Sequence, residues 1–289
     1  MQDKILYASV GVVFTIIVIL VLYPLIYVVS ASFSSGIALD SGKVVLWPVE
    51  PSLQSYKVMF SYRNVLPSYR NTIIYTALGT FINVAITLIA AYPLSRRDFP
   101  ARKLFMVICT ITMFFDGGMI PKYILVVDLG LYNTMWSLLL PGALSIFNMI
   151  LVRTYFVSSI PHELLEAAQI DGYDDINYFF RILLPLSKPV IAVITLYYAI
   201  GHWNSYFSAM LYLVDENKFP LQLVLRNILI STRFSLSDID DAELVAEMIG
   251  LANLLKYALI VVSSVPIIMM YPFVQRYFIK GVMIGSIKG

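Results

Sequence analysis

The sequence predicts an all-α integral membrane protein with six transmembrane helices. Hydrophobic residues make up 59% of the 289 residues and charged residues only 13%, and the mean hydropathy is +0.80. Soluble domains are closer to half apolar and a quarter charged, so lipid must cover part of this surface. In lipid the backbone has to satisfy its own hydrogen bonds, which leaves helices or a closed barrel. Barrel strands alternate polar and apolar residues over about ten positions, whereas stretches such as TIIVILVLYPLIYVV are continuously apolar.

Six long apolar segments are the predicted spans. A helix needs about 20 apolar residues to cross the hydrocarbon core. One segment, residues 104–127, contains Asp116 and Lys122, and the others contain no Asp, Glu, Lys or Arg. The first is too long for a signal peptide, whose apolar region has roughly 7 to 15 residues, so we expect an uncleaved span. The charge-free segments are residues 5–39, 71–95, 129–152, 189–214 and 257–275.

The short basic loop RRDFPARK, residues 96–103, sets the orientation. Loops rich in Lys and Arg stay in the cytoplasm, so six spans place both termini inside. Lys4 near one end and Arg276, Lys280 and Lys288 near the other agree with this. By the same count the loop before the fifth span is cytoplasmic. The segments 34–70 and 214–256 are predicted to face outward, the second as an extracytoplasmic loop.

The cytoplasmic segment 158–188 predicts two short helices joined by a turn. Pro161 suits the first turn of a helix, and Ser158 or Ser159 can cap it. Gly172 accepts the left-handed conformation that ends a helix. A second helix is predicted from about Tyr173 onward. It ends in a bend at Pro185 and Pro189, because proline lacks the N–H of an interior hydrogen bond.

Small residues at the tip of this segment suggest a docking surface. Ala167 and Ala168 leave a low relief that the side chains of another protein can approach closely. An amphipathic connector resting on the bilayer surface explains the same pattern, so the residues alone leave both interpretations open.

The spacing within the segment resembles the coupling loop of binding-protein-dependent ABC importers. The sequence matches the signature Glu-Ala-Ala-x3-Gly-x9-Ile-x-Leu-Pro at every defined position. The resemblance implies the ABC importer type I permease fold, a single transmembrane domain over residues 1–289, and a cytoplasmic coupling loop at 158–188. In that family the first short helix inserts into a cleft of the ATP-binding subunit. The residues to which this role is carried over are Glu166, Ala167, Ala168, Asp171, Gly172, Ile182, Leu184 and Pro185.

Other segments resemble the maltose-type sugar permeases, and most closely their polysaccharide/lipoprotein-associated oligosaccharide branch. These segments are residues 115–156, WNSYFSAMLYL at 203–213, and the C-terminal tail. Asp116 departs from the small neutral residue expected there. In the maltose relative such a tail reaches between the ATPase subunits, which implies that contact for Gly281, Gly285, Lys288 and Gly289.

The resemblance implies a multi-pass permease in a bacterial cell membrane that imports oligosaccharides, such as plant-wall or acidic polysaccharide fragments. Its implied partners are a homologous sister permease, two ATP-binding subunits and an extracytoplasmic solute-binding protein. By resemblance, the start of the outer loop, DENKFPLQL, corresponds to the region that probes the sugar cleft of that protein.

Motifs for catalysis are absent from the sequence. It has no GxxxxGK[ST] phosphate loop, so we expect ATP and Mg²⁺ on partner subunits and no cofactor in this chain. His162 and His202 belong to no cluster with metal-ligand spacing. The single Cys109 excludes an internal disulfide, and a net charge of +2 gives no nucleic-acid footprint. We therefore expect a non-catalytic transport subunit.

Polar and aromatic residues within the predicted spans are candidates for the substrate path. Amides and aromatic faces suit a sugar, but Asn and His also hydrogen-bond between membrane helices, and the sister permease holds the sugar in the maltose relative. An ion-coupled secondary transporter, which would carry ionisable residues in its spans, and an ABC permease for a non-sugar solute are the alternatives. The candidates are Asn83, Asp116, Asn148, His202, Trp203, Asn204 and Tyr206.

Overall fold

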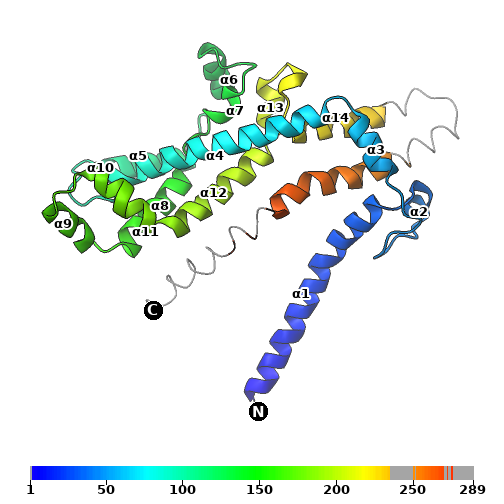
Figure 1. Ribbon diagram of the computed structural model, residues 1–289, viewed down its shortest axis with the longest axis horizontal. Helices are drawn as coiled ribbons and strands as arrows, with labels where there is room; N and C mark the ends of the chain where they lie inside the picture. Colours follow the sequence, from blue (N-terminus) through cyan, green and yellow to red (C-terminus); the bar gives the residue numbers. More distant parts are fainter. Residues whose placement is uncertain (1, 235–249, 251, 270–271, 273–274, 276–289) are drawn as a thin grey trace. The chain divides into compact units, whose positions relative to one another are not determined.

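The computed structural model describes residues 2–234, 250, 252–269, 272 and 275, and all regular structure within them is helical (Figure 1). The chain divides into two compact units: residues 1–67 with 224–266, and residues 68–223 with 267–289. The expected all-α class is confirmed for the described residues. A single transmembrane domain over 1–289 stays a prediction.

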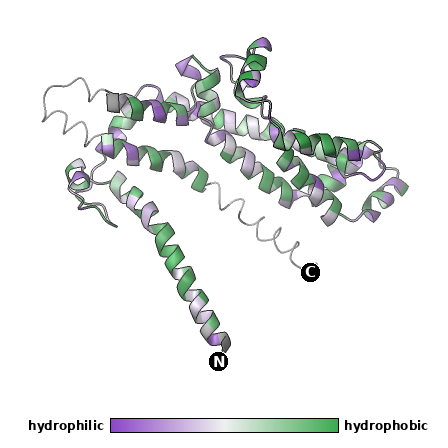
Figure 2. Cartoon of the chain, turned by 180° about the vertical axis from the view of Figure 1, so that it is seen from behind, coloured by the Kyte–Doolittle hydropathy of each residue, from purple (hydrophilic) through white to green (hydrophobic). Residues whose placement is uncertain are grey.

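The first unit contains α1 (Gln2–Ser32), the most hydrophobic of the long helices among the described residues. In α1 the span Ser9–Ser32 is strongly apolar, and it is exposed along most of its length, with burial only at its end, from Ser30 to Ser32. Figure 2 shows α1 hydrophobic along most of its length. A helix that is apolar on all sides belongs in a membrane or a large interior. The other helices of this unit are α2 (Gly36–Asp40), α3 (Gln54–Ser61), and most of both α14 (Leu221–Phe234) and Ala252–Met269.

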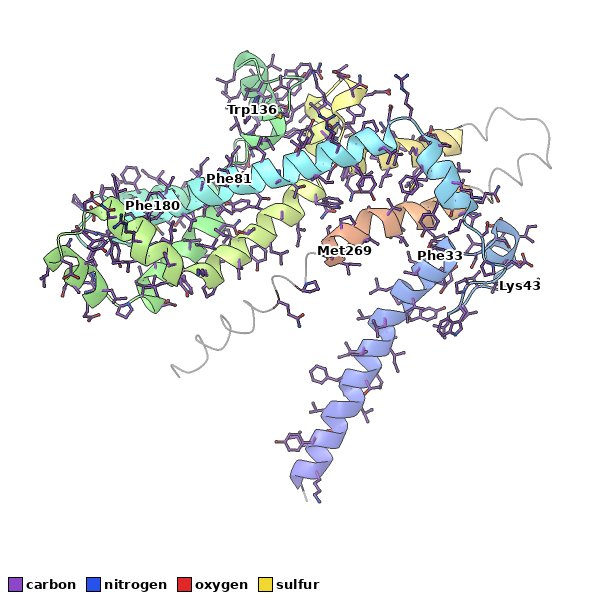
Figure 3. All side chains as sticks on the ribbon, in the orientation of Figure 1. Phe33, Lys43, Phe81, Trp136, Phe180 and Met269 are labelled. Atoms are coloured by element: carbon purple, nitrogen blue, oxygen red, sulfur yellow. The ribbon has the colours of Figure 1, made fainter. Side chains whose placement is uncertain are left out.

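The second unit is built along the 31-residue helix α4 (Val65–Ser95). Helices α4, α8 and α12 share one hydrophobic core with the short helices of the 158–188 segment. Apolar side chains also cover the outside, among them Phe81 and Phe180, which are 72% and 60% exposed (Figure 3). The remaining elements are α5 (Arg102–Phe114), α6 (Met119–Asp128), α7 (Trp136–Leu139), α8 (Ile146–Ser159), α9 (Glu163–Ile170), α10 (Asp175–Tyr178), a π-helix (Phe179–Leu183), α11 (Leu184–Leu186), α12 (Lys188–Trp203), α13 (Phe207–Tyr212) and a 3₁₀ turn (Glu216–Lys218).

Three helices in the described part of the chain are long and apolar enough to cross a membrane: Ser9–Ser32, Val65–Ser95 and Ala252–Met269. They match the first, second and last predicted spans. Two bent helix pairs raise the number to five if each pair is one span. Helix α8 is apolar but has only 14 residues.

The third and fourth predicted spans are not straight helices. Residues 104–127 bend by 111° between α5 and α6, where Gly118 has a φ of +88° and its N–H donates to Asp116 Oδ1. Residues 129–152 contain only the short α7 and the first half of α8, because Pro141-Gly142 interrupts the apolar stretch. Hydropathy correctly indicated that both segments are apolar, but it did not predict where their helices break.

A stripe of polar side chains on α4 is buried within the second unit. Thr72 Oγ1 accepts the Leu221 N–H at 2.7 Å, and the hydroxyl groups of Thr87 and Tyr198 lie 2.7 Å apart. Between Thr72 and Thr87, α4 approaches α12 very closely. A Cβ on Gly79 would lie 2.5 Å from atoms of the His202 imidazole, so this crossing requires glycine.

Replacement of Gly79 by alanine should therefore destabilise the α4–α12 crossing. Overpacking of a well-packed interior costs about 1–3 kcal/mol, which should lower the thermal unfolding midpoint of the purified protein in detergent. Gly201→Ala is the matched control, since nothing lies within 4 Å of a Cβ there. In a His202→Ala background Gly79→Ala should become nearly neutral. An equal loss in both backgrounds would show that the imidazole is not the obstacle.

Candidate functional site

The 158–188 segment forms a helix-turn-helix whose first helix is α9. Glu163 and Glu166 lie in its first turn, where carboxylates favour the positive end of the helix dipole. His162 Nε2 lies 3.8 Å from Glu166 Oε1. The predicted serine cap is wrong: α8 continues through Ser159, and the residue preceding α9 is His162, which makes no side-chain cap hydrogen bond.

Gly172 ends α9, as predicted. Its φ is +80°, and two backbone hydrogen bonds close the turn: Gly172 N–H to Gln169 O at 3.1 Å and Tyr173 N–H to Ala168 O at 2.9 Å. This is the Schellman arrangement, in which a left-handed residue satisfies the last carbonyl groups of a helix. Nothing lies within 4 Å of a Cβ at Gly172, so its requirement is conformational and not steric.

Helix α9 has a buried inner side and an exposed outer side. Leu165 and Ala168 are 6% and 3% exposed and belong to the shared core. The expectation that both alanines form an open surface is thus half wrong, because Ala168 packs inward while Ala167 is exposed. The side chain of Ile170 is 87% exposed. Sequence reasoning had not singled out Ile170 as part of a contact surface, although its spacing of four from Glu166 puts both on one face.

The second half of the segment leads directly into α12. Asp174 caps α10 by accepting the Asn177 N–H at 2.7 Å. A π-helix follows, closed by a hydrogen bond from the Leu184 N–H to Phe179 O, and the next residue is Pro185, which has no N–H to donate. The stretch Asp175–Leu186 then meets Lys188–Trp203 at 81°, which confirms the predicted bend. Ile182 and Leu184 pack against the core, whereas Pro185 is exposed.

A cationic side chain connects this segment to the end of α4. The guanidinium of Arg96 donates to both carboxylate oxygens of Asp98, at 2.8 and 2.6 Å, and to Asp175 Oδ1 at 2.8 Å. Its side chain is only 11% exposed. The hydrogen bonds from Arg96 lower the pKa of Asp98 to about 2, and those same bonds raise the pKa of Arg96. Both groups are therefore charged at neutral pH.

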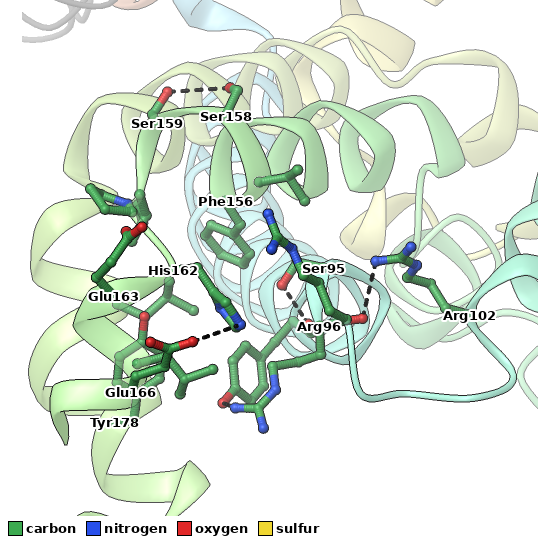
Figure 4. Close-up of a pocket in the computed structure, with 17 residues that line it drawn as sticks. Ser95, Arg96, Arg102, Phe156, Ser158, Ser159, His162, Glu163, Glu166 and Tyr178 are labelled. Carbon is green, nitrogen blue, oxygen red and sulfur yellow. Dashed lines mark hydrogen bonds and ion pairs between the residues drawn. The ribbon is translucent and has the colours of Figure 1, made fainter. Parts of the chain in front are cut away.

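Between α9 and this basic loop lies a cavity of about 490 Å³ (Figure 4). Its polar walls carry both signs of charge, with Arg96, Arg97 and Arg102 on the loop and Glu163 and Glu166 on α9. Figure 4 shows His162 beside Glu166. The balance of charges gives this cavity no clear preference for an anion or a cation.

Four of the predicted substrate-path residues lie inside the second unit or against a neighbouring helix. Asn83, Asn148 and Trp203 are buried at 3%, 5% and 4% exposure inside the second unit. The position of His202 against Gly79 is likewise an inter-helix contact. A role for these four residues in the substrate path stays a prediction.

Three other path candidates are open to the surface. Asn204 Oδ1 accepts a hydrogen bond from Gln222 at 3.3 Å, and Tyr206 is 44% exposed. Asp116 pairs with Lys122 at the break between α5 and α6. A role for any of them in the path stays a prediction. The tail residues Gly281, Gly285, Lys288 and Gly289 lie outside the described residues.

The start of the predicted outer loop is held firmly by its neighbours. Asn133, whose φ is +55°, accepts the N–H groups of Val214 and Asp215 on its side-chain oxygen, each at 3.1 Å. Its carbonyl oxygen accepts from Lys218 Nζ at 2.9 Å. The backbone N–H of Asn217 also donates to the Asp215 carboxylate and lowers its pKa. Residues 235–249 and 251 of this loop lie outside the described part.

Comparison with known proteins identifies the family. The family described as "Binding-protein-dependent transport system inner membrane component" matches residues 83–284. The chain is 40% identical over 266 residues to the polygalacturonan/rhamnogalacturonan transport system permease protein YtcP of Bacillus subtilis (strain 168), which covers 92% of each protein. It is also 40% identical over 266 residues to the protein LplC of the same strain, covering 92% of this chain and 89% of LplC.

A solved structure extends this similarity to three dimensions. It is the crystal structure of a bacterial ABC transporter involved in the import of the acidic polysaccharide alginate. One of its chains superimposes with a TM-score of 0.84 and 36% identity, covering 96% of this chain and 98% of that one. The chain described here therefore belongs to the family of binding-protein-dependent transport system inner membrane components, the permeases of ABC transporters.

Proposed function

We propose that this permease imports oligosaccharide fragments of acidic polysaccharides, with ATP hydrolysed by partner subunits. Support for the substrate class comes from YtcP, a polygalacturonan/rhamnogalacturonan permease, and from the alginate importer, two relatives whose substrates are both polysaccharides rich in carboxylates. A sister permease completes the pathway, and a solute-binding protein delivers the sugar outside. Both termini face the cytoplasm in this arrangement.

The exposed face of α9 is the observation that carries the mechanism. Glu163, Glu166, Ala167 and Ile170 recur at helical spacing and all are exposed, so they form one continuous strip. An ATP-binding subunit that grips this strip moves α9 as a body. The opposite side of α9 belongs to the core of α4, α8 and α12, and packed interiors transmit displacement because they do not compress. The bundle is then driven between inward- and outward-facing states.

Two substitutions in the coupling loop should abolish sugar uptake and leave membrane insertion intact. Glu166→Lys reverses a charge on the exposed strip of α9. Gly172→Pro cannot adopt the required φ of +80°, since proline is fixed near −65°. Uptake is measured with oligogalacturonate in proteoliposomes that contain the sister permease, the ATP-binding subunits and the binding protein. Lys103→Gln, which removes an exposed cation elsewhere on the predicted cytoplasmic side, is the control and should transport normally.

Normal uptake by both coupling-loop variants would reject α9 as the docking element. Uptake of a non-sugar solute in place of oligosaccharides would reject the substrate class but keep the mechanism. ATP hydrolysis by the purified chain alone would reject the assignment of hydrolysis to partner subunits.

The neighbouring alanines of α9 should respond differently to the same substitution. Ala168→Leu places three extra carbons in the core and should lower stability by about 1–3 kcal/mol. Ala167→Leu lies on the surface and should leave the thermal unfolding midpoint unchanged. It should instead reduce copurification of the ATP-binding subunit, because a larger side chain blocks close approach. Equal stability of the two variants would contradict the observed orientation of α9.

A further inference from the structure

Arg96 joins two parts of the second unit that are far apart in sequence. It follows the last residue of α4, while its partner Asp175 begins α10, 79 positions later. Tyr92, one turn earlier on α4, takes part in the same contact: its hydroxyl group donates to Asp175 Oδ1 at 3.2 Å and accepts from Arg96 Nη1 at 3.1 Å. The C-terminal end of α4 thus contacts the coupling loop through a three-residue network.

The geometry fixes the position of the guanidinium group. Two of its nitrogens are held by the carboxylate of Asp98, which leaves the third directed at Asp175. Bidentate arginine–carboxylate pairs are planar and directional in a way that a lysine ammonium cannot reproduce. The Tyr92 ring also packs on Phe179, with ring centroids 5.2 Å apart. Hydrogen bonds and aromatic packing therefore act at the same point.

The contribution of this network to overall stability is small by comparison. Asp98 and Asp175 are 65% and 63% exposed, and ion pairs with exposed partners contribute at most about 1 kcal/mol. The core cluster that joins α9 to α4, α8 and α12 is far more extensive. A purely stabilising role would thus make Arg96 nearly dispensable, whereas a positional role would not.

The other end of α4 holds the start of the predicted outer loop. Asn71 Nδ2 donates to the carbonyl groups of Asn217 and Phe219, at 2.7 and 3.1 Å. The Tyr75 hydroxyl group donates to Lys218 O at 2.9 Å. Helix α4 therefore has hydrogen bonds to the outer loop near one end and to the coupling loop at the other; Asn71 and Tyr92 lie about 32 Å apart along the helix at 1.5 Å per residue.

We propose that Arg96 is a positioning residue that ties the coupling loop to α4, so that α4 carries the signal between the solute-binding protein and the ATP-binding subunits. This inference rests on the proposed function. It adds a polar connection to the core packing of α9 on α4, α8 and α12 and to the covalent connection that leads from α9 through Pro185 into α12. The route through α12 follows the chain, whereas the route through α4 depends on side chains alone.

Arg96→Gln tests the proposal in the complete transporter in proteoliposomes. Basal ATP hydrolysis and assembly should remain, while the stimulation of hydrolysis by sugar-loaded binding protein should fall at least about fivefold, the lower end of typical coupling between sites. Uptake should fall in parallel. Arg96→Lys should give an intermediate stimulation of ATP hydrolysis, because lysine keeps the positive charge but lacks the planar set of donors of the guanidinium group. Lys103→Gln should match the wild type.

A double-variant cycle distinguishes a specific Arg96–Asp175 interaction from a nonspecific loss of function. Asp175→Ala should reproduce the loss of stimulation seen with Arg96→Gln, and the double variant should be no worse than either single one. Additive losses of stimulation in the double variant, or full stimulation of ATP hydrolysis in Arg96→Gln, would contradict the proposed connection between Arg96 and Asp175. If Arg96→Gln does not assemble, Asp175→Ala alone decides, since it leaves Arg96 paired with Asp98. A wild-type complex that neither imports oligogalacturonate nor responds to binding protein would reject the proposed function itself.

Discussion

Burial of the inner side of α9 is the interaction on which the rest of the second unit depends. Leu165 and Ala168 contribute to the same core as residues of α4, α8 and α12, so a surface helix of eight residues becomes part of the membrane bundle. An isolated helix of this length would be marginal in water. Tertiary packing therefore supplies its stability, and the Schellman turn at Gly172 fixes where it ends. The exposed strip of α9 has a defined position only because the opposite side is held.

Composition and charge-free stretches predicted the helical class and the location of three long spans, because hydropathy depends on residue type alone. They did not predict the breaks. The bend near Gly118 requires a left-handed glycine and a side-chain contact from Asp116, and the gap before α8 follows Pro141-Gly142. Gly and Pro are tolerated in membrane helices when neighbours satisfy the freed groups. Whether they break a given helix is decided by those neighbours, which a hydropathy window does not contain.

The coupling loop was the most predictable part of the site, since its signature is local in sequence. The turn at Gly172 and the bend at Pro185 and Pro189 follow from backbone chemistry and were predicted. The orientation of Ala168 and the partners of Arg96 were not. Arg96 had entered the sequence argument only as one of four cations that set the orientation of the chain. Its contact with Asp175 crosses 79 positions and depends on how α4 meets the coupling loop, which no local pattern specifies.

The coupling end and the middle of the α4–α12 pair differ in how completely their buried polar groups are hydrogen-bonded. At the coupling end apolar side chains interlock, and separating them would expose apolar surface. Midway along α4, the buried atoms Thr76 Oγ1, Thr80 Oγ1, Asn83 Oδ1 and His202 Nε2 have no hydrogen-bond partner among the described residues. Each such group costs about 1–3 kcal/mol, so movement that gave these atoms partners would recover free energy. A change of conformation thus costs less free energy in the middle of this helix pair than at the coupling end. This difference favours rigid movement at the coupling end and rearrangement of contacts in the middle.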